Sequence, residues 1–280
     1  MDSPVNERTV NFAHRKLQPF LFKYRISHQL SRPMFDTYAD IFEKRGQAYH
    51  EAMRRYPHAR DREFNALVDR IPPIAGSLIV DMPSGGGYLR SYLPKDDTQL
   101  IAVETTRAFY EQCREDERTT RQLSPLNNTG LPANSVDVVV SMAGMHHVEN
   151  RPAVFAEVYR ILKSGGQFCV ADVEEASVWD GFLNTFVNEH SSMGHTGQFI
   201  NDRFRTDLTE SGFSITSDEL VEYTWDFDTV DAMITYCTLM FGLDSATPEQ
   251  VKQGIRRYQG YTQHGPCQMN WGLRFICCTT

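Results

Sequence analysis

The chain has 280 residues, of which 41% are hydrophobic and 23% charged, a composition typical of a globular protein that can bury a core. Its formal net charge of −8 argues against a general nucleic-acid surface or an anionic-membrane surface, because phosphate groups attract clustered Lys and Arg. The polar N-terminus does not resemble a signal peptide, and no apolar run is long enough to span a membrane. These features predict a soluble, cytoplasmic protein, either a monomer or a homodimer, with neither nucleic acid nor membrane as a partner.

The six cysteines are spread along the chain without C-x-x-C spacing, and no histidine tract accompanies them. The sequence therefore predicts no metal site. Cys169, Cys277 and Cys278 lie in apolar, strand-like runs, so we expect buried thiols, which fit a reducing compartment.

The first 75 residues are rich in aromatic side chains and precede the first predicted core strand. Apolar residues recur at helical spacing between Pro33 and Tyr56, and again between Asp61 and Ile71, where Pro72 ends the pattern. The pattern predicts two helices.

The most informative stretch runs from Leu78 to Glu104. An apolar run that ends in Asp81 predicts a short buried strand, and the three glycines that begin at Gly85 predict a loop that lets a ligand approach the backbone. A helix follows, closed by Pro94, and then a second strand that ends in Glu104. An acid about 20 residues beyond such a loop is placed to accept hydrogen bonds from a ribose.

Two classes of ligand use this strand–loop–helix geometry. A dinucleotide site expects G-x-G-x-x-G, but Arg90 stands where the third glycine would fall. Asp81, shortly before the loop, suits a cationic ligand better than a pyrophosphate. The stretch from Asp81 to Gly87 resembles the first motif of class I S-adenosylmethionine-dependent methyltransferases, with Pro83 in place of the motif's first glycine.

The middle of the chain continues this resemblance. The β-branched run Asp137 to Ser141 predicts a strand, and a helix is expected over 152–162. The run YRILKSGGQFCVAD, residues 159–172, resembles the third motif of the same family, and several motifs in the right order are far more specific than one glycine turn. Before them, the charge-rich segment from Arg107 to Arg121 predicts an exposed helix, with a weak strand candidate near 121–123.

The C-terminal part carries helical patterns over 174–190, 203–211, 229–243 and 248–259, and strand patterns over 215–227 and 269–278. The resemblance implies that these two strands form an antiparallel pair at the end of the sheet. The expected fold class is α/β, a doubly wound, Rossmann-like seven-stranded sheet with a helical N-terminal lid and a helical insertion before the last strand.

The resemblance also implies a division of the chain. The segment 34–57 is similar to the N-terminal lid of ubiquinone/menaquinone-type small-molecule methyltransferases, so residues 1–75 are interpreted as a helical lid over a core of residues 76–280. Acceptor-site insertions are expected at about 174–212 and 228–265. A helix that simply packs on the sheet edge is the alternative interpretation of the lid segment.

The cofactor implied by the resemblance is S-adenosylmethionine. Asp81 would face its methionine ammonium group, Glu104 would hold the ribose, and Asn127 could pair with the adenine edge, because an amide carries both a donor and an acceptor. The residues expected at the cofactor are Asp81, Pro83, Gly85, Gly87, Glu104, Thr105, Asn127, Ser141 and Ala143.

Methyl transfer mainly requires that acceptor and methyl group be aligned, so no single catalytic residue is obligatory. His146 and His147 follow the fourth strand, where the methyl group should lie, and they are the best-placed candidates for a catalytic base. A role in the pocket wall is equally consistent with the sequence. The residues expected to contact the substrate are Tyr38, Tyr49, His190 and His195.

The sequence thus predicts S-adenosylmethionine-dependent methyl transfer to a small-molecule acceptor that is partly apolar or aromatic. One alternative is an enzyme that uses the same fold and cofactor for cyclisation, decarboxylation or another group transfer. Another is a non-catalytic binding module. A nicotinamide-dependent dehydrogenase is a weaker alternative because of Arg90.

Overall fold

The structure is a computed structural model that describes residues 38–71, 76–95, 97–262 and 266–280, with side chains from Phe42 onward. All of them belong to one compact unit, Pro33–Thr280. Predictions that concern residues 1–37, and the predicted substrate contact of the Tyr38 side chain, lie outside the described residues.

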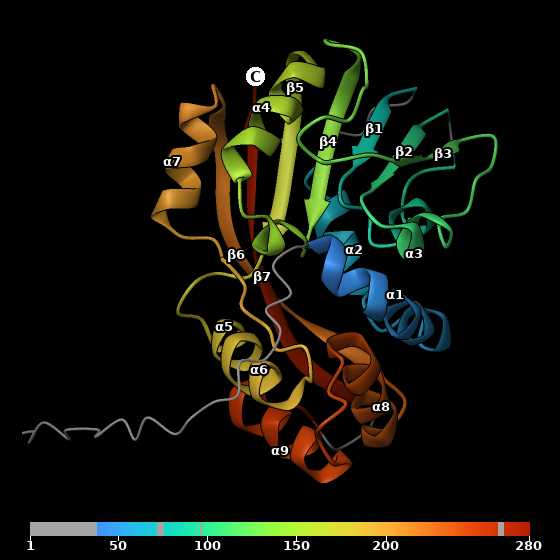
Figure 1. The fold of residues 1–280 in the computed structure, drawn as a ribbon, viewed down its shortest axis with the longest axis vertical. Helices are drawn as coiled ribbons and strands as arrows, with labels where there is room; N and C mark the ends of the chain where they lie inside the picture. The colour runs from blue at the N-terminus through green and yellow to red at the C-terminus, as the bar shows by residue number, and fades with distance from the viewer. Residues whose placement is uncertain (1–37, 72–75, 96, 263–265) are drawn as a thin grey trace, which may run out of the picture. The chain divides into compact units, whose positions relative to one another are not determined.

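The strands form one seven-stranded sheet in the order β3-β2-β1-β4-β5-β7-β6 (Figure 1). β7 runs antiparallel to both of its neighbours, whereas the other paired strands are parallel. This topology confirms the predicted doubly wound sheet with an antiparallel last strand. The strands are β1 Leu78–Asp81, β2 Gln99–Glu104, β3 Thr119–Leu123, β4 Val136–Met142, β5 Leu162–Asp172, β6 Ser214–Phe227 and β7 Cys267–Thr279.

Helices occupy the segments between the strands, and several begin at local capping signals. The side chain of Asn150 accepts a hydrogen bond from the Ala153 N–H at the start of α4, and Thr247 forms a capping box with Gln250 at the start of α9. The α-helices are α1 Tyr38–Arg55, α2 Asp61–Val68, α3 Arg107–Tyr110, α4 Arg151–Ile161, α5 Val178–Gly181, α6 Asn188–His190, α7 Asp202–Glu210, α8 Val230–Phe241 and α9 Pro248–Tyr258. Two short 3-10 helices, Tyr88–Ser91 and Met145–His147, and a π-helical turn, Phe182–Val187, complete the set.

Apolar layers cover both faces of the sheet. On one face, Phe155 of α4 and Phe204 of α7 pack with Val139 and Phe168 in one buried cluster. On the other face, α2 contributes Phe64 and Leu67 to a second cluster that includes Ile79 and Val138 of the sheet. Each fully buried side chain of this kind stabilises the fold by about 1.5–3 kcal/mol, so the sheet is a firm platform for the loops at its strand ends.

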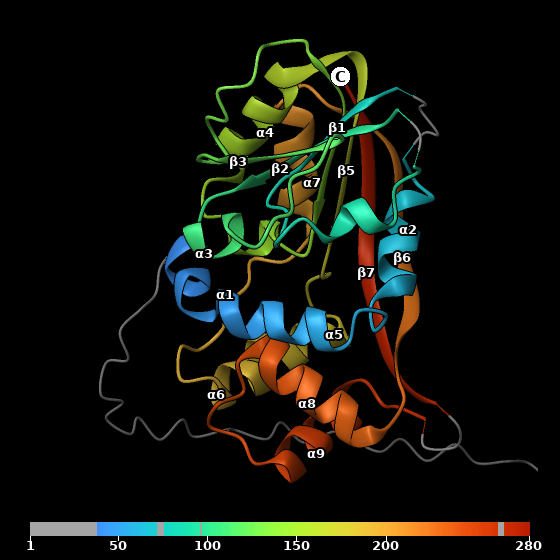
Figure 2. The same ribbon diagram turned by 90° about the vertical axis from the view of Figure 1, so that its right-hand side faces the viewer.

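Strands β6 and β7 are longer than the rest of the sheet. Pairing between β5 and β7 ends at Asp172 and Arg274, whereas β7 continues to pair with β6 as far as Phe227 and Cys267. In both views this two-stranded ribbon extends from the sheet toward α8 and α9 (Figures 1 and 2). The predicted helical insertion before the last strand is therefore confirmed, and it sits at the far end of the ribbon.

Helix α1 crosses between the carboxyl ends of the parallel strands and the group of helices α5, α6, α8 and α9 (Figure 2). It approaches α3 so closely that a Cβ on Gly46 would lie 3.0 Å from the Cβ of Ala108. On its other side, the Arg45 guanidinium donates a hydrogen bond of 2.9 Å to the Met240 carbonyl of α8. Contacts on both sides hold α1 over the strand ends.

The predicted helix from Arg107 to Arg121 is wrong. Helix α3 ends at Tyr110, and residues 119–123 form β3, which pairs in parallel with β2. Pairing with β2 overrides the weak local pattern, because a strand at a sheet edge needs little apolar character of its own. The helix expected after the glycine loop is also shorter than predicted, a 3-10 turn that ends at Ser91.

The prediction of thiols is wrong for two cysteines. Cys169 and Cys277 are directly opposed on β5 and β7 and form a disulfide, a pairing that depends on strand register and leaves no local sequence signal. The other cysteines are free and buried. Within the described ranges, no helix is long and apolar enough to cross a membrane.

Candidate active site

The glycine loop after β1 wraps around Glu104. Gly85, Gly86 and Gly87 have φ values of 63°, 103° and 75°, which glycine adopts without the strain of a side chain. In this conformation the Gly86 N–H lies 2.9 Å from Glu104 Oε1, and the Ser84 hydroxyl donates to the same oxygen at 2.7 Å. The first-motif loop and the predicted ribose-binding acid thus form one hydrogen-bonded unit.

The other carboxylate oxygen of Glu104, Oε2, is buried and has no hydrogen-bond partner among the described residues. Burial raises the pKa of Glu104 to about 7, against the lowering effect of the hydrogen bonds from Ser84 and the loop backbone. Asp81, at the end of β1, is also buried, and its pKa is raised well above the usual range by burial and then by the nearby Glu104. A ligand that carries hydroxyl donors and positive charge would satisfy this pair of acids.

A cavity of about 590 Å³ lies at the ends of β2, β3 and β4, where its lining begins at Thr105, the residue after Glu104. Thr105 and Asn127, two of the predicted cofactor residues, line it together with apolar side chains such as Leu126 and Val148. The hydroxyl oxygens of Thr105 and of Ser141, another predicted cofactor residue, are buried without a hydrogen-bond partner among the described residues. Unpaired buried donors and acceptors at one edge of the sheet fit a polar ligand.

Two other predicted cofactor residues, Pro83 and Ala143, lie where the loops after β1 and β4 meet. Pro83 packs so tightly against Gly144 that a Cβ there would lie 2.5 Å from the proline Cγ. Ala143 has a φ of 51° and lines a second, smaller cavity. The proline that replaces the motif's first glycine therefore shapes the turn that carries Ala143.

This second cavity measures about 80 Å³ and lies under α1. Its walls come from α1, from the loop after β4 and from the β6–β7 ribbon with α8. Five of its lining residues are aromatic side chains of Phe, Tyr or Trp: Phe42, Tyr49, Trp225, Phe241 and Trp271. Tyr49 links it to the glycine loop, since a Cβ on Gly85 would lie 3.3 Å from the Tyr49 hydroxyl.

A buried ion pair in the same cavity was not foreseen from the sequence. Arg60 donates from Nε to Glu63 Oε1 at 3.1 Å and from Nη1 to the Tyr49 hydroxyl at 2.8 Å. Glu63 Oε2 in turn accepts a hydrogen bond of 2.6 Å from the Trp225 indole. No local pattern in the charged segment HARDRE indicates that Arg60 and Glu63 are buried, because their partner Trp225 lies far along the chain.

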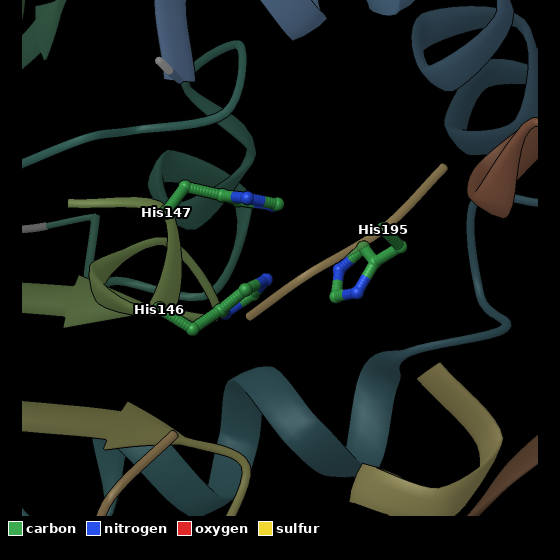
Figure 3. Close-up of side chains that lie close together, drawn as sticks. All are labelled: His146, His147 and His195. Atoms are coloured by element: carbon green, nitrogen blue, oxygen red, sulfur yellow. The ribbon is translucent and has the colours of Figure 1, made fainter. Parts of the chain in front are cut away.

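His146, His147 and His195 form a cluster in the wall of this second cavity (Figure 3). The ring centroids are 4.0 Å apart for His146 and His147, 5.5 Å for His146 and His195, and 5.3 Å for His147 and His195. Burial is the main reason why the pKa values of His147 and His195 lie well below the usual range. The structure thus brings together both predicted base candidates and one predicted substrate contact.

The His146 ring is held by Asp172, a residue that the sequence analysis did not select. Asp172 Oδ1 accepts from His146 Nδ1 at 2.7 Å, and Oδ2 accepts from the His146 backbone N–H at 2.9 Å. An acid at the carboxyl end of β5 was a visible signal, because ligands of doubly wound sheets lie at that edge. The His190 ring, in contrast, packs at a tilt against Phe186, with ring centroids 4.6 Å apart, and His190 is not among the residues that line the cavity.

Comparison with known proteins agrees with this geometry. Residues 80–170 match the family model described as a methyltransferase domain. The chain is 27% identical over 150 residues to a demethylmenaquinone methyltransferase of Symbiobacterium thermophilum, which covers 50% of this chain and 57% of that protein. It is 26% identical over 109 residues to the S-adenosyl-L-methionine-dependent Diels-Alderase iccD of Talaromyces variabilis, covering 36% and 37% respectively.

Among solved structures, an S-adenosylmethionine-dependent methyltransferase from Thermotoga maritima superposes with a TM-score of 0.56 at 17% identity, over 85% of this chain and 97% of that one. Residues 80–170 thus carry a methyltransferase domain, the fold is that of the class I S-adenosylmethionine-dependent methyltransferases, and S-adenosylmethionine is the cofactor of that class. The chain spans less than two thirds of the length of the curated relatives that it matches.

Proposed function

We propose that this protein transfers a methyl group from S-adenosylmethionine to a small-molecule acceptor that is partly apolar or aromatic. The observation that carries the proposal is the unpaired Oε2 of Glu104, a buried acceptor held in place by the glycine loop. A ribose hydroxyl would supply the missing donor. Asp81 offers negative charge for the methionine ammonium group, and Thr105 and Asn127 line the space in which the nucleoside would lie.

The cofactor supplies an electrophilic methyl group, so the task of the chain is to bind, to orient and to exclude water. Aromatic walls around the second cavity favour a planar or apolar acceptor body. His147 has a pKa well below the usual range, so it is neutral at physiological pH and can accept a proton from an acceptor. His146 is positioned by Asp172 beside it.

We further propose that residues 1–75 act as a lid on a core of residues 76–280, with acceptor-side insertions at about 174–212 and 228–265. Support comes from the described part of the lid, where α1 covers the strand ends and Tyr49 lines both the second cavity and a small cleft that it shares with Asp81 and Gly85. The second cavity, at about 80 Å³, is small for an acceptor, so α1 has to move to admit one.

The test is a thermal-shift and calorimetric titration with S-adenosylhomocysteine, with NAD as the control ligand. S-adenosylhomocysteine alone should raise the melting temperature, because a ligand that binds only the folded state stabilises it. Glu104→Ala should weaken its affinity at least tenfold, about 1.4 kcal/mol, whereas the exposed Glu117→Ala should not. Equal affinity in all three proteins would remove Glu104 from the site, and no binding would favour a non-catalytic module.

A second candidate function is non-methyl chemistry with the same cofactor bound, such as a cyclisation. The similarity to the Diels-Alderase iccD supports this alternative. The two candidates separate in product analysis. Methyl transfer converts S-adenosylmethionine to S-adenosylhomocysteine and adds a labelled methyl group to the acceptor, whereas cyclisation leaves the cofactor intact and the substrate mass unchanged.

A further inference from the structure

The histidine cluster has the arrangement of a metal site as well as that of a catalytic base. One ligand nitrogen from each of His146, His147 and His195 can be chosen so that all three lie within 4.8 Å of one another. Two of the rings come from the turn after β4 and the third from the loop after α6, and Figure 3 shows them gathered around a common space. This geometry brings three strong nitrogen ligands together from segments far apart in the chain.

The hydrogen bonds of His146 define its tautomer. Its Nδ1 lies 2.7 Å from a carboxylate oxygen of Asp172, which can only accept when ionised, so Nδ1 carries the proton. In a neutral ring, Nε2 is then left with its lone pair. A carboxylate that holds the outer nitrogen of a histidine is the usual partner of a metal-binding imidazole, because it fixes the ring and increases its basicity.

The tautomer of His195 is defined in the same way by Asn184. The Asn184 amide nitrogen donates to Asp180 at 3.0 Å and to the Gly197 carbonyl at 3.1 Å, and its Oδ1 accepts from the Gly197 N–H at 2.7 Å. These contacts fix which end of the amide is oxygen. That oxygen lies 3.1 Å from His195 Nδ1, which must therefore be the donor, and Nε2 again keeps the lone pair.

The cluster therefore presents a lone pair on His146 and another on His195, close to the third imidazole, that of His147. His146 and His195 are only 6% and 8% exposed, so water has little access to stabilise these lone pairs. A cation between the rings removes their mutual repulsion.

We propose that His146, His147 and His195 bind a divalent transition-metal ion, with Zn²⁺ the best fit, and that its fourth coordination position opens to the acceptor cavity. Three imidazoles with no thiolate or carboxylate match the ligand set of catalytic zinc sites, which keep one position for water or substrate. The Arg45 cation opposes the site electrostatically, and the ionised Asp172 offsets it. This assignment departs from the sequence prediction of no metal, since the ligands form no local motif.

The site would also define the acceptor class, a step that rests on the proposed function. A metal ion in this wall would bind an acceptor through a hydroxyl or phenol oxygen and lower its pKa, which favours the anionic nucleophile. Its apolar body would lie against the aromatic lining, for example Trp271 and Phe241. The expected acceptor is therefore a hydroxylated aromatic or apolar molecule.

The first experiment measures metal without any activity assay. The full chain is stripped with a chelator and titrated with Zn²⁺ and with Co²⁺ at neutral pH, and bound metal is counted by mass spectrometry. We expect one ion per chain and, by X-ray absorption, nitrogen ligands at about 2.0–2.1 Å. A sulfur shell at about 2.3 Å, or no retained metal, would overturn the proposal regardless of whether the protein methylates anything.

The second experiment uses variants to test whether the ion binds at these histidines. His146→Ala and His195→Ala should each weaken Zn²⁺ affinity by at least about 100-fold, and Asp172→Asn by about 10- to 100-fold, because it removes only the partner of a ligand. His190→Ala is the matched control and should retain the ion, because the His190 ring lies on the same stretch but packs against Phe186. If the histidine variants bind Zn²⁺ as tightly as His190→Ala does, the site lies elsewhere. Should an alanine variant fail to fold, the absorption spectrum of the wild-type protein and the Asp172→Asn affinity still decide the question.

Discussion

The two cavities at the strand ends differ in how they are built. The larger one, about 590 Å³, is formed by loops that directly follow neighbouring parallel strands, and the unpaired hydroxyl of Thr105 belongs to its lining. The smaller one, about 80 Å³, is closed by side chains from α1, α8 and the β6–β7 ribbon, and hydrogen bonds join four of its side chains to one another: Tyr49, Arg60, Glu63 and Trp225. The first is ready to receive a ligand, whereas the second has to open before an acceptor can enter.

The largest expected effect on stability comes from the ion pair between Arg60 and Glu63 in the smaller cavity. Arg60→Met leaves Glu63 buried without its cation, and we expect a loss of about 3–5 kcal/mol in the free energy of unfolding, measured by urea titration. Arg62→Met is the control, because its pair with Asp226 is largely exposed and should contribute no more than about 1 kcal/mol. Equal losses in the two variants would mean that the cavity wall does not depend on Arg60.

The next effect concerns turnover. His147→Ala removes either a proton acceptor or a metal ligand, and turnover should fall by about 100-fold or more while the affinity for S-adenosylhomocysteine stays close to wild type. Steady-state kinetics and calorimetry on the same preparations make the comparison. Wild-type turnover in His147→Ala would contradict any chemical role for this residue, and His190→Ala should behave like the wild type.

The smallest effect concerns pH and the larger cavity. The pKa of Glu104 is about 7 in the folded protein and 4.5 for an ordinary Glu, so between these values the folded chain keeps a proton that the unfolded chain releases. The free energy of unfolding therefore decreases as pH rises through this window. Glu104→Gln has no carboxyl group to titrate, so its free energy of unfolding should not show this decrease. The difference between its melting temperature and that of the wild type should therefore rise by a few degrees, in favour of the variant, between pH 5 and pH 8. If the difference in melting temperature between the two proteins stays constant over this pH range, burial does not raise the pKa of Glu104.

The cofactor edge could be predicted in detail because its residues follow one another in the chain. Asp81, Gly85 and Glu104 belong to a single strand–loop–strand unit, and its spacing alone indicates their arrangement. The acceptor side could be predicted only in its general character. The convergence of His147 with His195, and of Glu63 with Trp225, depends on the packing of segments that no local pattern connects.

Individual errors have the same origin. The helix predicted to reach Arg121 stops at Tyr110, and the weak strand candidate near 121–123 is confirmed because β2 is available beside it. Cys169 faces Cys277 because of the register between β5 and β7. The cytoplasmic location stays a prediction, and these two cysteines no longer support it as thiols. The roles of the individual site residues likewise stay proposals that the variants above can decide.

The ribbon formed by β6 and β7 allows one part of the chain to change in evolution while another part stays the same. Beyond the point where β5 stops, β6 and β7 pair only with each other among the named strands. Helices α8 and α9 are therefore connected to the end of this two-stranded ribbon and not to the central sheet. Insertions, deletions or exchanges of the segment between residues 228 and 266 would change the acceptor wall and leave the glycine loop and Glu104 undisturbed. The segment between residues 228 and 266 could therefore be exchanged between related chains in order to change which acceptor the protein binds.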